Sequence, residues 1–119
     1  MEIFRDFTFD AAHAIDGLPE GHKCKNMHGH TYRLTVYLTG GLDPKIGWIL
    51  DFADLKRLVW SECLDQLDHK NLNEVAEMGS PTCENITLWI WNRLKPKLPG
   101  LTRITVREGV NSGCTYSGS

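Results

Sequence analysis

The sequence predicts an α+β domain in which an antiparallel sheet carries two helices on one face. Two stretches of alternating polar and apolar residues come first, two segments with helical periodicity follow, and alternation returns near the end. Strand pairs on both sides of a helical pair favour a four-stranded antiparallel sheet in the order ββααββ. With 119 residues, the chain is expected to form one domain over residues 1–119.

Two strands are expected in the first third of the chain. Residues 2–10 alternate, and Phe7 and Phe9 fall on the same face, as a half-buried strand requires. Residues 30–39 alternate more clearly, with Tyr32 on the apolar face. We expect these two strands to pair.

Two helices should fill the middle of the chain. Asp51 is placed to cap the first helix, whose apolar stripe reaches about Leu67. The run Ser80-Pro81-Thr82, with a capping hydroxyl beside a proline suited to a first turn, is placed to start a second helix that stops before Pro96. The apolar faces of the two helices are predicted to be Phe52, Leu55, Leu58, Val59 and Cys63, and then Ile86, Trp89, Ile90 and Leu94.

Polar and apolar residues alternate again in residues 102–108, which predicts a strand, and residues 114–117 are predicted to form a short last strand. Glu108 is in phase with Ile104 and Val106, so its carboxylate ends a core-facing row. An unpaired charge there would cost several kcal/mol. Glu108 therefore either meets a ligand with adjacent N–H donors, and is incompletely paired without it, or bends into water.

Composition narrows the function class. A net charge of -2 and a pI of about 6.2 argue against nucleic-acid binding. Apolar stretches fall far short of the roughly 20 residues that span a bilayer, so no membrane role is expected.

The first residues lack the apolar core of a secretory signal, and the four cysteines form no C-x-x-C pair. We expect free thiols in a reducing, cytoplasmic compartment. Cys63 and Cys83 are expected to pack against neighbours, while the role of Cys114 stays open.

Three histidines are candidate metal ligands. His28 and His30 lie two residues apart on an extended segment, so both side chains point to the side that continues into Tyr32. A first strand extended beyond residue 10 brings His13, in phase with Phe9, to the same side. Three neutral imidazoles with one open position are typical of a catalytic zinc site. Three hydrogen-bonded core histidines are the alternative.

Cys24 is a candidate for proton transfer. It precedes His28 by four residues and lies between Lys23 and Lys25, cations that favour a thiolate. Cys24 can therefore be a base or nucleophile, a fourth zinc ligand, or an inert loop thiol, and the residues alone leave all three open. His22 is expected in a solvated loop.

Asp68 and His69 follow the first helix. An imidazole near a carboxylate can shuttle protons, and the acid stabilises the charged form of the ring. Adjacent side chains seldom orient each other, so a solvated helix end is the alternative. The sequence does not decide between the two.

Together these motifs resemble the 6-pyruvoyl-tetrahydropterin synthase family along essentially the whole chain. The resemblance rests on five segments, which are Phe9-Asp10-Ala11-Ala12-His13, Cys24-Lys25-Asn26-Met27-His28-Gly29-His30, Leu67-Asp68-His69, Pro81-Thr82-Cys83-Glu84-Asn85 and Val106-Arg107-Glu108. The spacing C-x3-H-G-H is similar to the queuosine-pathway branch, whose members make 6-carboxy-5,6,7,8-tetrahydropterin. The branch that makes tetrahydrobiopterin typically has a longer gap between the cysteine and the histidines.

The resemblance implies the tunnelling fold, or T-fold, in which subunits join edge to edge into a barrel. The expected assembly is a homohexamer, a dimer of trimers, with active sites at subunit interfaces. It implies the following residue roles: zinc (Zn2+) on His13, His28 and His30, Cys24 as the base, Asp68 and His69 as relay groups from the neighbouring subunit, and Glu108 holding the pterin ring. Backbone groups near Thr82 and Cys83 are the other candidates for holding the ring.

The implied reaction converts 7,8-dihydroneopterin triphosphate to 6-carboxy-5,6,7,8-tetrahydropterin, acetaldehyde and triphosphate. Candidate anchors for the triphosphate are Lys23, Lys25 and Arg107, by charge alone. Three alternatives remain. The chain could have 6-pyruvoyl-tetrahydropterin synthase activity, it could be a generic zinc hydrolase with three histidine ligands, or it could be a zinc-stabilised module without catalysis.

Overall fold

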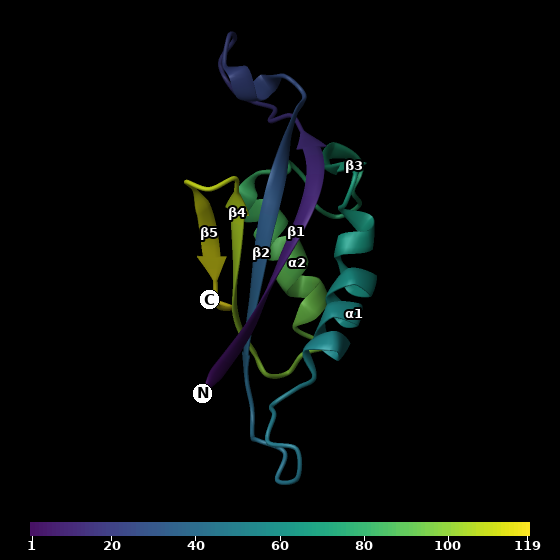
Figure 1. The fold of residues 1–119 in the computed structure, drawn as a ribbon. Coiled ribbons are helices and arrows are strands. Elements are labelled where there is room, and N and C mark those ends of the chain that lie inside the picture. Colours follow the sequence, from purple (N-terminus) through teal and green to yellow (C-terminus); the bar gives the residue numbers. More distant parts are fainter.

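The computed structural model describes residues 1–119, which form a five-stranded sheet with two helices on one face (Figure 1). The strands are β1 (Glu2–His13), β2 (His28–Thr39), β3 (Lys70–Asn71), β4 (Leu101–Glu108) and β5 (Gly113–Tyr116). The helices are α1 (Phe52–Glu62) and α2 (Cys83–Leu94). The strand order is β3-β1-β2-β4-β5, and all pairs except β3 with β1 are antiparallel. The α+β class is confirmed.

The sheet has one strand more than the four predicted. The additional strand, β3, contains only two residues and runs parallel to β1 beside Ala11 and Ala12. Two residues show no alternation, and their pairing depends on how the chain turns back after α1. β3 holds the preceding Asp68 and His69 beside the edge of β1.

α1 ends at Glu62, whereas the apolar stripe predicted a helix to about Leu67. Cys63 leaves the helical conformation at φ -131° and ψ -64°, and Leu64–Gln66 then form a separate 3₁₀ turn. Leu64 and Leu67 are nevertheless fully buried. The apolar pattern therefore indicates which residues contact the core, and these residues continue beyond the point where the helical hydrogen bonds stop.

The first helix begins at the predicted cap Asp51, and the second begins within the predicted run Ser80-Pro81-Thr82, with Thr82 as its cap. The Asp51 carboxylate accepts a hydrogen bond from the Ala53 N–H at 2.9 Å, and the Thr82 hydroxyl accepts one from the Asn85 N–H at 3.1 Å. Such a cap contributes about 1 kcal/mol to stability. At Thr82 it also fixes where α2 begins.

β1 and β2 form a long hairpin, and both strands extend further toward the histidines than the alternation predicts. Their register pairs Glu2 with Thr39 at one end and His13 with His28 at the other. Cross-strand partners share a face of the sheet, so this register decides which side chains meet. It brings the histidines of both strands to the helix-covered face.

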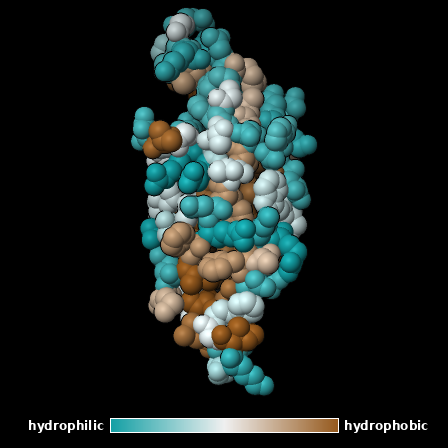
Figure 2. All heavy atoms as spheres, viewed as in Figure 1, coloured by the Kyte–Doolittle hydropathy of each residue, from teal (hydrophilic) through white to brown (hydrophobic).

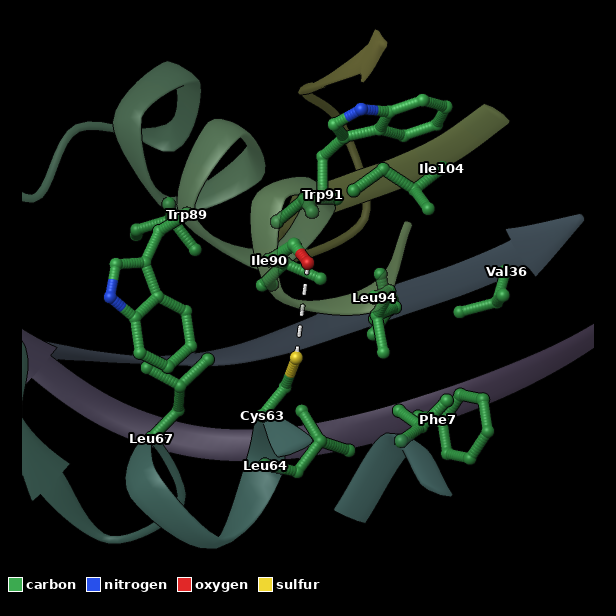
Figure 3. Close-up of a cluster of buried hydrophobic side chains, with 14 of the residues drawn as sticks. Phe7, Val36, Cys63, Leu64, Leu67, Trp89, Ile90, Trp91, Leu94 and Ile104 are labelled. Carbon is green, nitrogen blue, oxygen red and sulfur yellow. Dashed lines mark hydrogen bonds between the residues drawn. The ribbon is translucent and has the colours of Figure 1, made fainter. Parts of the chain in front are cut away.

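The core lies between the sheet and the two helices, as Figure 3 shows. The whole predicted apolar face of α2 is buried, and each large side chain there contributes about 1.5–3 kcal/mol. Cys63 packs in the same core, with its sulfur 3.9 Å from the carbonyl oxygen of Ile90 (Figure 3). Burial raises the pKa of the Cys63 thiol to about 12. Phe52 departs from the prediction, because 46% of it is exposed.

The other face of the sheet is polar. Hydrogen bonds of 2.5 Å run from Thr31 to Asp10 and from Thr35 to Asp6 across the β1–β2 hairpin. Figure 2 shows hydrophilic side chains over most of the molecule and apolar ones near the lower end, where Figure 1 places the N-terminus and the connection from β2 to α1. Neither helix is long and apolar enough to cross a bilayer.

Candidate active site

Three imidazoles converge where the β1–β2 hairpin begins to open. The ring centroids of His13 and His28 are 4.6 Å apart, those of His13 and His30 5.0 Å, and those of His28 and His30 4.9 Å. One ring nitrogen from each lies within 4.8 Å of the other two. This spacing suits three ligands around a single metal ion.

Backbone carbonyls determine which nitrogens can bind a metal. Nδ1 of His13 lies 2.7 Å from the carbonyl oxygen of Pro81, and Nδ1 of His28 lies 2.7 Å from that of Asn26. A carbonyl only accepts, so both Nδ1 atoms carry the hydrogen and both Nε2 atoms keep a free lone pair. Nε2 of His13 is buried without any partner, which costs free energy unless a ligand is present. These residues therefore fit a zinc ion.

His30 keeps its ring neutral, as a metal ligand must. Burial lowers its pKa, the nearby Glu108 carboxylate opposes that shift, and the other two imidazoles add to the lowering. The net pKa lies below its ordinary value of 6.5. At neutral pH the ring has a lone pair for a metal.

The histidines form part of the wall of a cavity of about 570 Å³. The lining includes most of the candidate site residues, namely His13, His28, His30, Cys24, Thr82, Cys83 and Glu108, together with Ile15, Lys23, Glu84 and Ser112. Residues from β1, β2, β4, α2 and the connection from β1 to β2 thus face one space. A metal, a thiol and a carboxylate can act there on a single small molecule.

Cys24 lies in a short 3₁₀ turn, Lys23–Lys25, within the connection between β1 and β2. Its carbonyl oxygen accepts the Ile15 N–H at 2.8 Å, and its own N–H donates to Nδ1 of His22 at 3.1 Å. His22 is exposed, as expected of a solvated loop, but its ring also caps the turn that carries Cys24. Sequence patterns gave no sign of this capping, because it depends on the local backbone.

Glu108 ends β4 opposite Tyr32, and 24% of its side chain is exposed. Its carboxylate makes one long contact, 4.0 Å from Nε2 of His30. This agrees with the expectation that the group is incompletely paired without a ligand. Burial, reinforced by the Glu108 charge, raises the pKa of Tyr32 well above its usual range, so this neighbour stays uncharged. Glu108 thus presents an available acceptor to the cavity.

Thr82 and Cys83 place the start of α2 at the cavity. The Thr82 hydroxyl oxygen accepts a hydrogen bond from the Asn85 N–H, which leaves its own O–H able to donate. The N–H groups in the first turn of a helix have no acceptor within the helix. Backbone donors of Cys83 and Glu84 are therefore the groups that α2 can offer.

Asp68 and His69 do not line this cavity within one chain. They lie beside the edge of β1, where the His69 N–H donates to the Asp10 carbonyl oxygen at 2.6 Å. Nδ1 of His69 is 3.0 Å from the Asp68 carboxylate, and 77% of the His69 side chain is exposed. His69 therefore reaches outward from the sheet edge.

The contact between these two neighbours corrects the expectation that adjacent side chains do not orient each other. His69 has a positive φ of 59°, a conformation that turns its ring back toward Asp68. Burial alone would raise the pKa of Asp68, but hydrogen bonds from the Asp10 N–H and from His69 lower it overall. The pair is thus a carboxylate–imidazole unit.

Only one of the three candidate phosphate anchors faces the cavity. Lys23 lines it. The Lys25 ammonium is 2.6 Å from the Glu20 carboxylate, and Arg107 is exposed and absent from the lining. Lys23 is thus the one lysine or arginine in the cavity lining.

Comparison with known proteins places these features in a family. A family model described as 6-pyruvoyl tetrahydropterin synthase matches residues 2–119. A dihydroneopterin monophosphate aldolase from Pyrococcus furiosus is 40% identical over 109 residues, covering 89% of this chain and 88% of the relative. A 6-carboxy-5,6,7,8-tetrahydropterin synthase from Haemophilus influenzae is 34% identical over 140 residues, covering 98% of both.

A solved structure agrees with the sequence relatives. The 6-pyruvoyl tetrahydropterin synthase of Caenorhabditis elegans superposes with a TM-score of 0.88 at 32% identity, covering 100% of this chain and 96% of that one. The match spans every strand and both helices described above. The chain therefore belongs to the 6-pyruvoyl tetrahydropterin synthase family of pterin-processing enzymes.

Proposed function

We propose that the protein converts 7,8-dihydroneopterin triphosphate and water to 6-carboxy-5,6,7,8-tetrahydropterin, acetaldehyde and triphosphate, a step of queuosine biosynthesis. The observation that carries this proposal is the single cavity shared by three converging histidines, Cys24 and Glu108. The name of the Haemophilus influenzae relative and the short spacing between Cys24 and His28 support this branch of the family.

The residues His13, His28 and His30 would hold a zinc ion. Bound zinc supplies a Lewis acid that makes a substrate hydroxyl easier to deprotonate. The two carbonyl oxygens that hold Nδ1 of His13 and of His28 keep these rings in the tautomer that zinc binds. The chain thus orders these two ligands before the metal arrives.

Cys24 is the proposed base. Its thiolate would take a proton from the substrate side chain and return one later, as the triphosphate leaves and a carbon–carbon bond breaks. The hydrogen bonds of its 3₁₀ turn to Ile15 and His22 keep the thiol at the cavity wall. A positioned thiol can then act repeatedly on the same substrate atoms.

Glu108 is the proposed anchor for the pterin ring. The ring presents an N–H beside an amino group, and one carboxylate can accept both hydrogen bonds. The two orphan N–H groups of Cys83 and Glu84 can hold an acceptor of the same ring. These contacts would place the side chain of the substrate beside the histidines and Cys24.

Asp68 and His69 are proposed to act in the cavity of a neighbouring subunit. Within one chain they lie beside an edge of the sheet and outside the cavity. β1 is paired at this edge only over Ala11 and Ala12, so most of the edge is open to a second copy. A T-fold hexamer built from trimers would close both edges and add cations for the triphosphate. Residues 1–119 would act in it as one cytoplasmic domain.

A second candidate is an aldolase that acts on dihydroneopterin monophosphate. The name of the Pyrococcus furiosus relative suggests it. The single cation at the cavity, Lys23, favours it too, because a monophosphate carries less charge than a triphosphate. An aldolase would cleave the same substrate side chain and retain its phosphate ester.

Product analysis tests the proposal. Zinc-loaded protein is incubated separately with the triphosphate and with the monophosphate of dihydroneopterin, and Cys24→Ala serves as the control. Acetaldehyde and free triphosphate with a 6-carboxypterin support the proposal, and a 6-pyruvoyl product indicates the sister activity. A phosphorylated two-carbon aldehyde from the monophosphate alone identifies the aldolase. Zinc-loaded protein that leaves both compounds intact contradicts the proposal.

A further inference from the structure

Two cysteines whose thiols the proposed chemistry does not use meet beside the cavity. The sulfur of Cys83, in the first turn of α2, is 3.4 Å from the sulfur of Cys114 in β5. The two residues are 31 positions apart in the sequence, so only the fold brings them together. Cys83 also lines the cavity that contains Glu108.

The surroundings hold both sulfurs in this position. Cys83 Sγ lies 3.5 Å from the carbonyl oxygen of Val106, and Cys114 Sγ lies 3.4 Å from that of Cys83. The Thr87 hydroxyl is 2.9 Å from Cys114 Sγ. Both cysteines are only partly buried, whereas Cys63 is fully buried and packs against Ile90. The pair is therefore preorganised for a bond between the two sulfurs.

We propose that Cys83 and Cys114 form a reversible disulfide that controls the wall of the substrate cavity. A disulfide requires about 2 Å between the sulfurs, so each needs to move by less than about 1 Å. The two residues lie on different elements, α2 and β5. The bond would tie the start of the helix to the edge strand.

The oxidant is a low-molecular-weight disulfide such as oxidised glutathione. Burial and the neighbouring Cys114 raise the pKa of Cys83, so that thiol stays protonated and Cys114 attacks first. The Thr87 hydroxyl donates to the Cys83 carbonyl oxygen at 2.7 Å, and it can turn its hydrogen to the Cys114 thiolate 2.9 Å away. That thiolate displaces one glutathione thiolate and forms a mixed disulfide.

The second step closes the bond. Cys83 loses its proton and attacks Cys114 Sγ, and the second glutathione leaves as a thiolate and takes up a proton. In total, two protein thiols lose two electrons and two protons, and one glutathione disulfide becomes two thiols. Excess dithiothreitol reverses the change.

Formation of the disulfide would affect substrate binding through Cys83. This effect on the substrate rests on the proposed function. Cys83 adjoins Thr82 at the cavity, and β4 carries Glu108 on the same wall. Displacing a substrate-positioning group by about 1 Å can reduce a rate about a hundredfold. The disulfide form should therefore turn over more slowly than the thiol form.

Peptide mapping tests the bond itself. The purified protein is incubated with oxidised glutathione, blocked with an alkylating reagent and cleaved with trypsin, which separates the two cysteines by cutting after Arg93 and after Arg107. We expect a linked peptide pair, two hydrogen atoms lighter than the sum, that dithiothreitol separates. Cys63→Ala should give the same pair. If Cys83 and Cys114 stay as free thiols or link elsewhere, the proposal is overturned.

Activity and melting test the consequence. Oxidation should raise Tm by at least about 5 °C, because the bond constrains the unfolded chain, and should reduce turnover at least tenfold. Cys114→Ser, with Cys114→Ala as a second variant, should keep the basal turnover and show neither effect. Any inhibition left in these variants measures oxidation of Cys24. If the wild-type protein loses no more activity on oxidation than the two Cys114 variants do, the proposal that the disulfide controls the cavity is overturned. The mapping and Tm results hold even if the proposed reaction is wrong.

Discussion

Nδ1 of His13 donates a hydrogen bond to the carbonyl oxygen of Pro81 at 2.7 Å, joining the end of β1 to the residue that precedes the α2 cap. One bond thus relates a candidate metal ligand to the segment expected to hold the pterin ring. The same bond directs Nε2 of His13 into the cavity. The metal site and the ring site are therefore mechanically connected.

We expect about one zinc ion per chain. Metal analysis of His28→Ala should show its loss, while circular dichroism shows that the fold is largely kept, because the apolar core forms without the metal. Zinc retained in full after both His13 and His28 are replaced would show that the ligands lie elsewhere.

Cys24→Ala should keep zinc and substrate binding, while turnover falls at least about a hundredfold, the usual contribution of a positioned acid–base group. Single-turnover kinetics together with equilibrium binding separate the two effects. Loss of zinc from this variant would instead make Cys24 a metal ligand.

Glu108→Gln should weaken substrate binding by roughly 1.5–3 kcal/mol, about ten- to a hundredfold, with zinc content unchanged. The amide places an N–H against a donor of the ring and removes the charge. Titration calorimetry with a substrate analogue measures the change. Glu84→Gln is the matched control, because Glu84 lines the same cavity but is exposed. Equal affinities for Glu108→Gln and the parent would place the ring on the backbone near Thr82 and Cys83.

The metal-free protein should lose stability as the pH falls below about 6.5. The folded state lowers the pKa of His30, so below the unfolded pKa the unfolded chain binds a proton that the folded chain does not. The stability is present above that pH and is lost as the pH falls toward the folded pKa. Urea titrations between pH 5 and pH 8 measure the slope, and His30→Gln should flatten it. An unchanged slope would assign the pH dependence to other groups.

His69→Ala should reduce turnover more than substrate binding. If the relay comes from a neighbouring subunit, mixing His69→Ala with Cys24→Ala subunits during refolding should restore part of the activity, since some sites then contain both intact residues. A mixture of Cys24→Ala with the double variant is the control and should stay inactive. Equal inactivity of both mixtures would place the relay and the base in the same chain.

The periodic pattern of apolar residues was sufficient to predict the main helices and strands and the convergence of the three histidines. A strand alternates with period two, so the phase of His13 with Phe9, and of His28 and His30 with Tyr32, already places all three on one face. The register of the hairpin then brings them together. Glu108 could be singled out by the same rule, from its phase with Val106.

Features that depend on distant contacts or on single backbone angles were not predictable. β3 has only two residues and needs β1 as its partner. The contact between Asp68 and His69 depends on the positive φ of His69. Cys83 and Cys114 come together only when α2 packs on β5, and no local pattern marks that pair.

The β1–β2 hairpin also determines which changes in chain length the site can tolerate. Inserting one residue into either strand would move His13 or His28 to the opposite face of the sheet. Residues 14–27 lie between the strands, so they can gain or lose residues without moving the histidines. Cys24 lies within that segment, and its distance from the metal would change with each such insertion. Evolution can therefore adjust the acid–base chemistry by indels in one loop while the metal centre stays intact.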